Sequence, residues 1–293
     1  MDRREFLKAL PIGIWGIKEC FANGINDIVN STIAEKNNAS EPDSNKDSSL
    51  NHNYSVLIHP GHVKGNPGCE LKGVGIEYIL TTRIAEDLEK LLKEQNIGVL
   101  MARNENDFSL ELKKYKQENR GKFLGRKIDT YTMLKWAEDK GADALISIHI
   151  NDVPPENRPF NTGYAVISSS KNGSLKKSRQ LAKMVHESIG QSFPPSNNLN
   201  EASYVKQDGA PVLLSGFMNS PFYILGSDEY SHKIPAIIVE CGFISQKYKG
   251  SNGQELTIGN PEIQQLYAQR IAKGIMDYIA EDRKSRFKEK TRP

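Results

Sequence analysis

Ser55-Val-Leu-Ile-His-Pro-Gly-His62 is a short apolar, partly β-branched run that ends in a glycine turn between two histidines. Four later runs of similar composition each predict a strand, and they cover residues 97–101, 144–148, 162–168 and 236–239. The run at 236–239 is too apolar for an exposed sheet edge, so we expect it to lie inside the sheet.

Helical periodicity fills the intervals between these runs. Residues 77–94 place apolar side chains on one stripe, namely Ile79, Leu80, Ile84, Leu88, Leu91 and Leu92. Residues 128–140 and 175–189 predict further helices, and Asn260-Pro261 supplies the N-cap and first-turn proline of a last helix that reaches about residue 279. Strands that alternate with helices predict an α/β fold, with a single domain whose mostly parallel or mixed twisted sheet carries helices on both faces.

The N-terminal residues have the pattern of an export signal. Arg3-Arg4 precedes Phe6-Leu7-Lys8 and a weak apolar stretch diluted by glycine, which is typical of a twin-arginine signal peptide. An amphipathic first helix is the alternative, and Pro11 disfavours it. We therefore expect an exported protein of the periplasm or the cell envelope.

The composition predicts four segments along the chain. Residues 1–22 form the signal peptide, and the Asn- and Ser-rich residues 23–53 form a flexible linker that cannot bury enough apolar surface to fold. Residues 54–280 form the globular domain, and residues 281–293 form a charged tail that begins as a frayed helix end.

Charge and cysteine content exclude several classes of protein. The 39 Lys and Arg residues against 36 Asp and Glu residues leave a net charge of +3, which is too small for a dedicated nucleic-acid-binding protein. The longest uncharged apolar run, residues 9–17, is too short to span a membrane. Cys20, Cys69 and Cys241 cannot build a disulfide framework; Cys69 and Cys241 are either core thiols, which we favour, or a pair formed in an oxidising compartment. We expect a monomer.

Two histidines and two glutamates occupy strand ends and a helix start. His62 follows the first predicted strand, Glu77 opens the first predicted helix, His149 follows residues 144–148, and Glu240 follows residues 236–239. Open α/β sheets build their sites where the carboxyl ends of strands meet. Two imidazoles and one carboxylate, with a fourth position left to water, are the ligand set of a hydrolytic zinc site.

Each of these residues also has a simpler explanation. A histidine at a strand end is more often a hydrogen-bonded structural residue, and a glutamate at a helix start can interact favourably with the helix dipole. A cysteine hydrolase that uses Cys241 is disfavoured, because no activating histidine lies beside it in the sequence.

Taken together, the blocks resemble the zinc-dependent N-acetylmuramoyl-L-alanine amidases, a family of peptidoglycan hydrolases, over nearly all of residues 54–279. The matching blocks are Ile58-His-Pro-Gly-His62, Gly75-Ile-Glu77, Ala102-Arg103 with Asp107, Ala142-Asp143 with Ser147-Ile-His-Ile-Asn151, and Val239-Glu-Cys-Gly-Phe243. The resemblance implies that His62, Glu77 and His149 bind one zinc ion and that Glu240 is the catalytic carboxylate.

The sequence departs from the family pattern at three places. His59 stands where an aspartate is usual, and it either orients a zinc ligand or shapes the turn. Met133 replaces a usual arginine, and residues 112–127 form a basic insertion that we interpret as a solvated surface helix. The long stretch 151–234 is expected to form a groove wall or a lid; some relatives carry an autoinhibitory helix there, and no such helix is evident in this sequence.

The function that the resemblance implies is zinc-dependent hydrolysis of the amide bond between N-acetylmuramic acid and L-alanine in peptidoglycan, for cell-wall remodelling or cell separation. The alternatives are a non-catalytic peptidoglycan-binding or regulatory protein on the same fold, and a zinc hydrolase that acts on another amide. Targeting is expected to come from the linker, the basic insertion or a partner, of which an activator protein is one candidate.

Overall fold

The structure, a computed structural model, describes residues 54–105, 107–120, 128–153, 155–169, 172–194, 196, 205–207, 210–212, 223–226 and 232–290. The expected signal peptide and linker lie outside the described residues, as do residues 121–127 of the basic insertion. The described residues within 53–248 and 255–293 belong to one compact unit.

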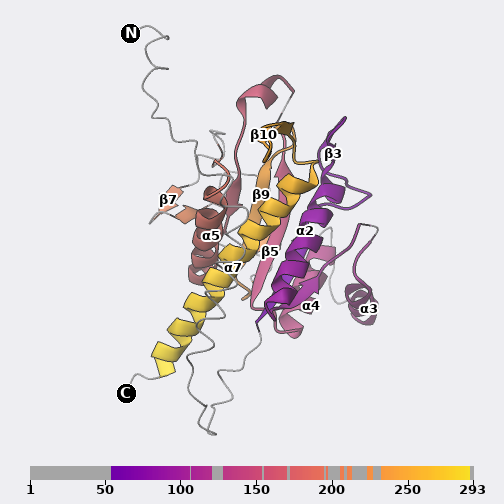
Figure 1. Ribbon diagram of the computed structural model, residues 1–293. Helices are drawn as coiled ribbons and strands as arrows, with labels where there is room; N and C mark the ends of the chain where they lie inside the picture. The colour runs from indigo at the N-terminus through magenta and orange to yellow at the C-terminus, as the bar shows by residue number, and fades with distance from the viewer. Residues whose placement is uncertain are drawn as a thin grey trace. The chain divides into compact units, whose positions relative to one another are not determined.

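A five-stranded sheet organises this unit, with the strand order β4–β1–β5–β9–β6 (Figure 1). The strands are β1 (Ser55–Pro60), β4 (Gly98–Met101), β5 (Ala144–Asn151), β6 (Ala165–Ile167) and β9 (Ala236–Phe243). The first four in this order are parallel, and β6 runs antiparallel to β9. The expected mixed, mostly parallel sheet is confirmed, and the apolar strand β9 lies between two neighbours rather than at an edge.

Helices cover both faces of the sheet, as the periodicity predicts. Helices α2 (Glu77–Glu94), α5 (Leu175–Gly190) and α7 (Pro261–Lys290) share one buried cluster with the sheet. Helices α3 (Leu110–Glu118) and α4 (Ile128–Asp139) share a second cluster on the other face. None of the helices in the described part of the chain combines the length and apolar character that a membrane span requires.

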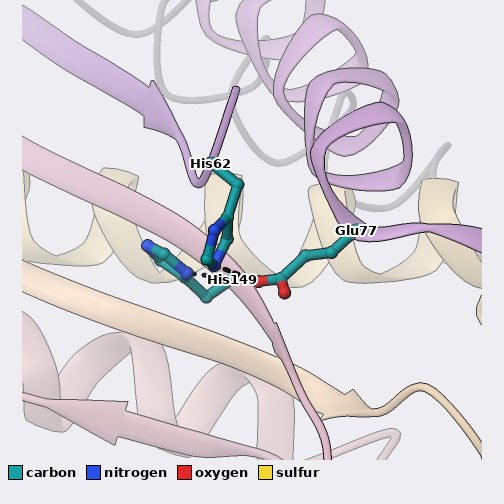
Figure 2. A group of neighbouring side chains, drawn as sticks. All are labelled: His62, Glu77 and His149. Carbon is teal, nitrogen blue, oxygen red and sulfur yellow. Dashed lines mark hydrogen bonds and ion pairs between the residues drawn. The ribbon is translucent and has the colours of Figure 1, made fainter. Parts of the chain in front are cut away.

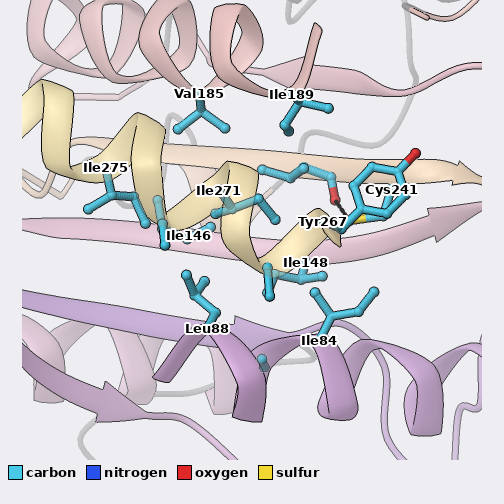
Figure 3. Close-up of a cluster of buried hydrophobic side chains, with 14 of the residues drawn as sticks. Ile84, Leu88, Ile146, Ile148, Val185, Ile189, Cys241, Tyr267, Ile271 and Ile275 are labelled. Atoms are coloured by element: carbon cyan, nitrogen blue, oxygen red, sulfur yellow. Dashed lines mark hydrogen bonds between the residues drawn. The ribbon is translucent and has the colours of Figure 1, made fainter. Parts of the chain in front are cut away.

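The alternation of side chains along β5 separates the two clusters. Ile146 and Ile148 point into the cluster formed with α2, α5 and α7, where they meet Leu88 and Ile271 (Figure 3). Leu145 belongs to the opposite cluster. His149 has the parity of Leu145, so it lies on the α4 face, at the carboxyl end of the strand.

Short elements connect these parts. They are β2 (Glu70–Leu71), β3 (Gly75–Ile76), β7 (Val205–Gln207), β8 (Ala210–Val212), β10 (Tyr248–Lys249), β11 (Glu255–Leu256) and the 3₁₀ helices η3 (Pro155–Phe160) and η4 (Tyr223–Leu225). Strands β2 and β3 pair antiparallel directly before α2. The described parts of the long stretch 151–234 include β6 and α5, so much of it belongs to the sheet and its cover.

The last helix is longer than the sequence predicts. It continues to Lys290, so that residues 281–290, expected as a frayed end, are helical. Asp282 explains part of this extension, because its buried carboxylate accepts a hydrogen bond from Tyr54 and forms ion pairs with Lys177 at 3.0 Å and Arg286 at 2.6 Å. These contacts fasten the additional turns to α5 and to the start of β1.

Candidate metal centre

The loop after β1 positions His62. Gly61 N donates to Ile148 O at 2.7 Å, which ties the loop to β5 one residue before His149. A side chain at Gly61 would place its Cβ 2.5 Å from His149 Cε1, so only glycine lets this imidazole approach the loop so closely. His62 itself has a φ of 62°, a left-handed conformation that is uncommon for a residue with a side chain and that often accompanies function.

The first residue of α2 delivers a buried carboxylate. Glu77 N donates to Cys69 O at 2.9 Å, and the Glu77 side chain is 4% exposed. Its Oε2 accepts from Cys69 N and its Oε1 from Ile150 N, each at 3.0 Å. Gly68, with a φ of 75°, leaves the space for this carboxylate, which a Cβ at that position would overlap. The loop therefore holds Glu77 in a single orientation.

His62, Glu77 and His149 converge although they come from three separate segments (Figure 2). Glu77 Oε1 lies 3.3 Å from His62 Nε2 and 3.2 Å from His149 Nδ1. The two imidazole rings meet edge to face with their centroids 5.0 Å apart. One donor atom from each residue lies within 4.8 Å of the other two, and this is the only such group of His, Cys, Asp and Glu among the described residues.

The electrostatics of the cluster keep Glu77 ionised. Burial alone would raise the pKa of Glu77, but the hydrogen bonds with His149 and His62 outweigh it and hold that pKa well below its usual range. The pKa of His62 is raised, chiefly by its hydrogen bond to Glu77. Two imidazole nitrogens and a carboxylate oxygen gathered at one point are donors that suit zinc. The donor set fits a hydrolytic zinc site.

Glu240 lies on the strand next to His149. The register of β9 against β5 makes Glu240 and His149 Cα partners, with the strands about 4.8 Å apart. Partners in register point to the same face of the sheet, so the Glu240 side chain lies next to that of His149 on this face. On its other side Glu240 pairs with Ala165 of β6.

His59 faces the neighbouring strand. Its Nδ1 lies 2.9 Å from Ser147 Oγ, and its ring centroid is 6.4 Å from that of His149. Burial, together with the neighbouring His149, lowers the pKa of His59 well below its usual value, so this imidazole is neutral. His59 thus connects β1 to β5 at Ser147, two residues before the candidate ligand His149.

Arg103 contributes to the site in a way that the sequence analysis missed. It is 1% exposed and donates hydrogen bonds to Pro60 O and to Tyr78 O, both at 3.0 Å. In the sequence, Arg103 belongs to the block Ala102-Arg103, which matches the family pattern, but the resemblance gives this arginine no role. Burial lowers the pKa of Arg103 to about 10, so it stays charged at neutral pH.

The two cysteines near the site are free thiols. Cys69 Sγ donates to Ile150 O at 3.5 Å, whereas Cys241 is buried in the core. Burial raises the pKa of both thiols, so they stay protonated. This arrangement agrees with the favoured interpretation of core thiols.

The described part of the basic insertion is a surface helix, as interpreted from its charge. In α3 the apolar anchor is Leu112, and Lys116 pairs with Asp129 of α4 at 2.5 Å. Asp107, from the Ala102-Arg103 block, pairs with Lys113 at 2.7 Å. Met133 of α4 stands where the family usually has an arginine, and it is buried in the cluster that α3 and α4 form with the sheet.

Comparison with known proteins places this α/β domain in a family. Residues 56–277 match the sequence model of the N-acetylmuramoyl-L-alanine amidases, so the chain belongs to this family. The chain is similar to the amidase AmiC of Neisseria meningitidis serogroup B, with 23% identity over 243 residues that cover 76% of this chain and 52% of AmiC. It therefore spans about half the length of that curated relative.

Solved structures share the fold. Amidase AmiC2 of Nostoc punctiforme is similar with a TM-score of 0.50 and 23% identity, over 78% of this chain and 97% of that one. The CwlD amidase of Clostridioides difficile, solved in complex with the GerS lipoprotein, has a TM-score of 0.51 and 20% identity, over 78% of this chain and 99% of that one. The similarity supports the same single α/β domain.

Proposed function

We propose that the protein is a zinc-dependent N-acetylmuramoyl-L-alanine amidase that hydrolyses the amide bond between N-acetylmuramic acid and L-alanine in peptidoglycan. The observation that carries the proposal is the convergence of His62, Glu77 and His149 at one point, with Glu240 beside them on β9. Membership of the amidase family supports the choice of bond.

His62, Glu77 and His149 would hold the ion. Zinc bound there would polarise the scissile carbonyl and lower the pKa of the attacking water. Glu77 supplies the only negative charge among the three donors, so the centre keeps a net positive charge that favours an electron-rich carbonyl oxygen. The hydrogen bonds from Cys69 N and Ile150 N fix the orientation of this carboxylate before substrate arrives.

Glu240 is the proposed general base. It would take a proton from the attacking water and return it to the departing amine of L-alanine, because an amide nitrogen leaves poorly as an anion. Its position on the strand next to His149 supports this role, since it brings the carboxylate beside the cluster without making it one of the three converging donors.

Two other functions are less well supported. A peptidoglycan-binding protein without turnover would not need all four of His62, Glu77, His149 and Glu240. A zinc hydrolase of another amide could use the same cluster, but the family match favours the amidase reaction.

Metal analysis of the full-length protein tests the proposal. We expect one zinc ion per chain, loss of peptidoglycan hydrolysis in a chelator, and recovery when zinc is returned. His62→Ala and His149→Ala should each lose the metal, whereas His186→Ala, which changes a histidine on α5, should keep it. Full zinc occupancy in either of the first two variants would remove that histidine from the site.

We further infer that the protein is exported by the twin-arginine route and acts in the cell envelope. Arg3-Arg4 before a weak apolar stretch supports this route. Changing both arginines to lysine should leave an uncleaved precursor in the cytoplasm, and unchanged export would contradict the inference.

We also propose that an activator protein binds this chain. The support is that the similar CwlD amidase was solved in complex with the GerS lipoprotein.

A further inference from the structure

Arg103 lies between the two segments that carry His62 and Glu77. Its Nε donates to Pro60 O at 3.0 Å, and its Nη2 donates to Gly61 O at 2.5 Å. The same Nη2 donates to Tyr78 O at 3.0 Å. One guanidinium therefore bonds the backbone directly before His62 and the backbone directly after Glu77.

Two buried hydroxyls of α2 complete this contact. Thr82 Oγ1 accepts from Arg103 Nη1 at 2.6 Å and donates to Tyr78 O at 2.7 Å. Thr81 Oγ1 donates to Gly61 O at 3.0 Å, and so connects the helix to the loop directly. Thr81 and Thr82 are at most 1% exposed. We call Arg103, Thr81 and Thr82 the Arg103 clamp.

The clamp reaches the third candidate ligand through the same loop. Gly61 receives hydrogen bonds from Arg103 and Thr81 at its carbonyl oxygen and donates from its own N–H to Ile148 O, next to His149. The segments that bear His62, Glu77 and His149 thus meet at one residue, Gly61, whose carbonyl oxygen accepts both hydrogen bonds from the clamp.

The charge of Arg103 indicates that the clamp does more than fill space. Its hydrogen-bond acceptors are carbonyl and hydroxyl oxygens, the last being Asn104 O at 3.0 Å. A buried cation paired with neutral acceptors is unfavourable compared with an apolar side chain of similar volume. What the guanidinium adds is a planar set of N–H groups that fixes several oxygens in defined directions, which neither an apolar residue nor lysine can reproduce.

We propose that Arg103, assisted by Thr81 and Thr82, is a positioning residue for the metal centre. The clamp sets the distance between the His62 loop and the Glu77 helix. It therefore fixes the relative positions of the donor atoms before the ion binds. The inference rests on the proposed zinc site. Residues that orient metal ligands typically change metal affinity by about 10–100-fold when they are altered, and we expect a loss in this range.

Zinc titration of the full-length protein against a competing chelator tests the clamp. Arg103→Lys keeps the positive charge but loses the planar fork, and Thr81→Val keeps the side-chain shape but removes the hydroxyl. Both variants should bind zinc about 10–100-fold more weakly than the unchanged protein. Ser178→Ala is the matched control, because it removes a buried hydroxyl that accepts from Ala236 N at 3.1 Å, at the start of β9 and far along the strand from Glu240.

A second readout separates positioning from general stability. The visible spectrum of the Co²⁺-loaded protein reports ligand geometry, and it should change in the clamp variants and not in Ser178→Ala. Unfolding curves of the metal-free variants show whether each one folds. If Arg103→Lys does not fold, the zinc affinity of Thr81→Val tests the inference. The inference is wrong if a folded clamp variant binds zinc as tightly as the unchanged protein, or if Ser178→Ala weakens binding equally. Absence of zinc binding in the unchanged protein would instead refute the proposed function.

Discussion

Gly61 and Gly68 set how closely the three donor residues approach one another. A Cβ added at Gly61 would overlap the ring of His149. A Cβ added at Gly68 would overlap the carboxylate of Glu77 and would lie 2.8 Å from His62 Cδ2. Neither glycine is exchangeable without moving a ligand, because the opposing groups are themselves held by hydrogen bonds. The close approach of the three donor residues thus depends on two glycines, which have no side chain that would mark them as part of the site.

The first prediction follows from these glycines. Gly61→Ala should displace the His149 ring and lower zinc affinity by at least tenfold, which zinc competition measures. Gly65→Ala is the control on the same loop, because its Cβ would meet nothing within 4 Å. Equal zinc affinity in the two variants would contradict the assigned geometry.

The second prediction concerns Glu240. Glu240→Gln keeps the shape of the side chain and removes the base, so turnover should fall by about 10²–10⁴ while zinc and peptidoglycan still bind. Steady-state rates and zinc analysis of the same preparation measure both effects. Loss of zinc would make Glu240 a ligand, whereas unchanged turnover would favour the non-catalytic alternative.

At the residue level the sequence predicted which side chains come together, but not what holds them in place. His62, His149 and Glu240 stand at the ends of apolar runs, so the rule that parallel strands meet at their carboxyl ends brings them together. The Arg103 clamp joins residues that lie between 20 and 43 positions apart in the sequence, largely through backbone carbonyls that carry no sequence signal. Only the folded structure reveals such contacts.

At the level of elements, α5 and α7 pack closely at a glycine. The Cβ of any side chain at Gly274 of α7 would lie 2.5 Å from Val185 Cα of α5, a backbone atom that cannot move without shifting the helix. The third prediction is that Gly274→Ala lowers the free energy of unfolding by about 1–3 kcal/mol, although alanine favours an isolated helix.

Denaturant unfolding measures this effect. Ser285→Ala, at an exposed position of the same helix, should change the free energy of unfolding by less than about 0.5 kcal/mol. A Gly274→Ala variant as stable as the unchanged protein would mean that the two helices can separate without loss.

Periodicity predicted the helices well because each buries one face. The apolar stripe of α2 gave its bounds, Glu77–Glu94, from sequence alone. The end of α7 was missed, because its last turns are held by the polar contacts of Asp282 rather than by an apolar stripe. Charged residues there suggested a tail, although one carboxylate among them is buried.

At the scale of the whole molecule, Asp282 connects the start of β1, α5 and the end of α7. Burial raises the pKa of Asp282, but the hydrogen bonds from Tyr54 and Lys177 outweigh burial, and the net shift is downward. A carboxylate with a lowered pKa in the folded state stabilises the protein above its unfolded pKa of about 3.9, and this contribution is lost as the pH falls through the lower folded value.

The fourth prediction is that Asp282→Asn lowers the free energy of unfolding at neutral pH by about 1.5–3 kcal/mol, and that the difference from the unchanged protein shrinks below about pH 4. Unfolding curves at several pH values measure it. Asp277→Asn, which removes an exposed ion pair with Lys273 on the same helix, should change stability by less than about 1 kcal/mol. A pH-independent difference for Asp282→Asn would contradict the assigned ion pairs.

The most direct test of the proposed activity is digestion of intact peptidoglycan by the zinc-loaded protein, followed by mass spectrometry of the products. The amidase reaction predicts stem peptides with a new free amino group on L-alanine, together with glycan strands whose lactyl groups end in free carboxylates. New reducing sugar ends, or peptides cut internally, would contradict the proposal and place the enzyme among glycosidases or peptidases.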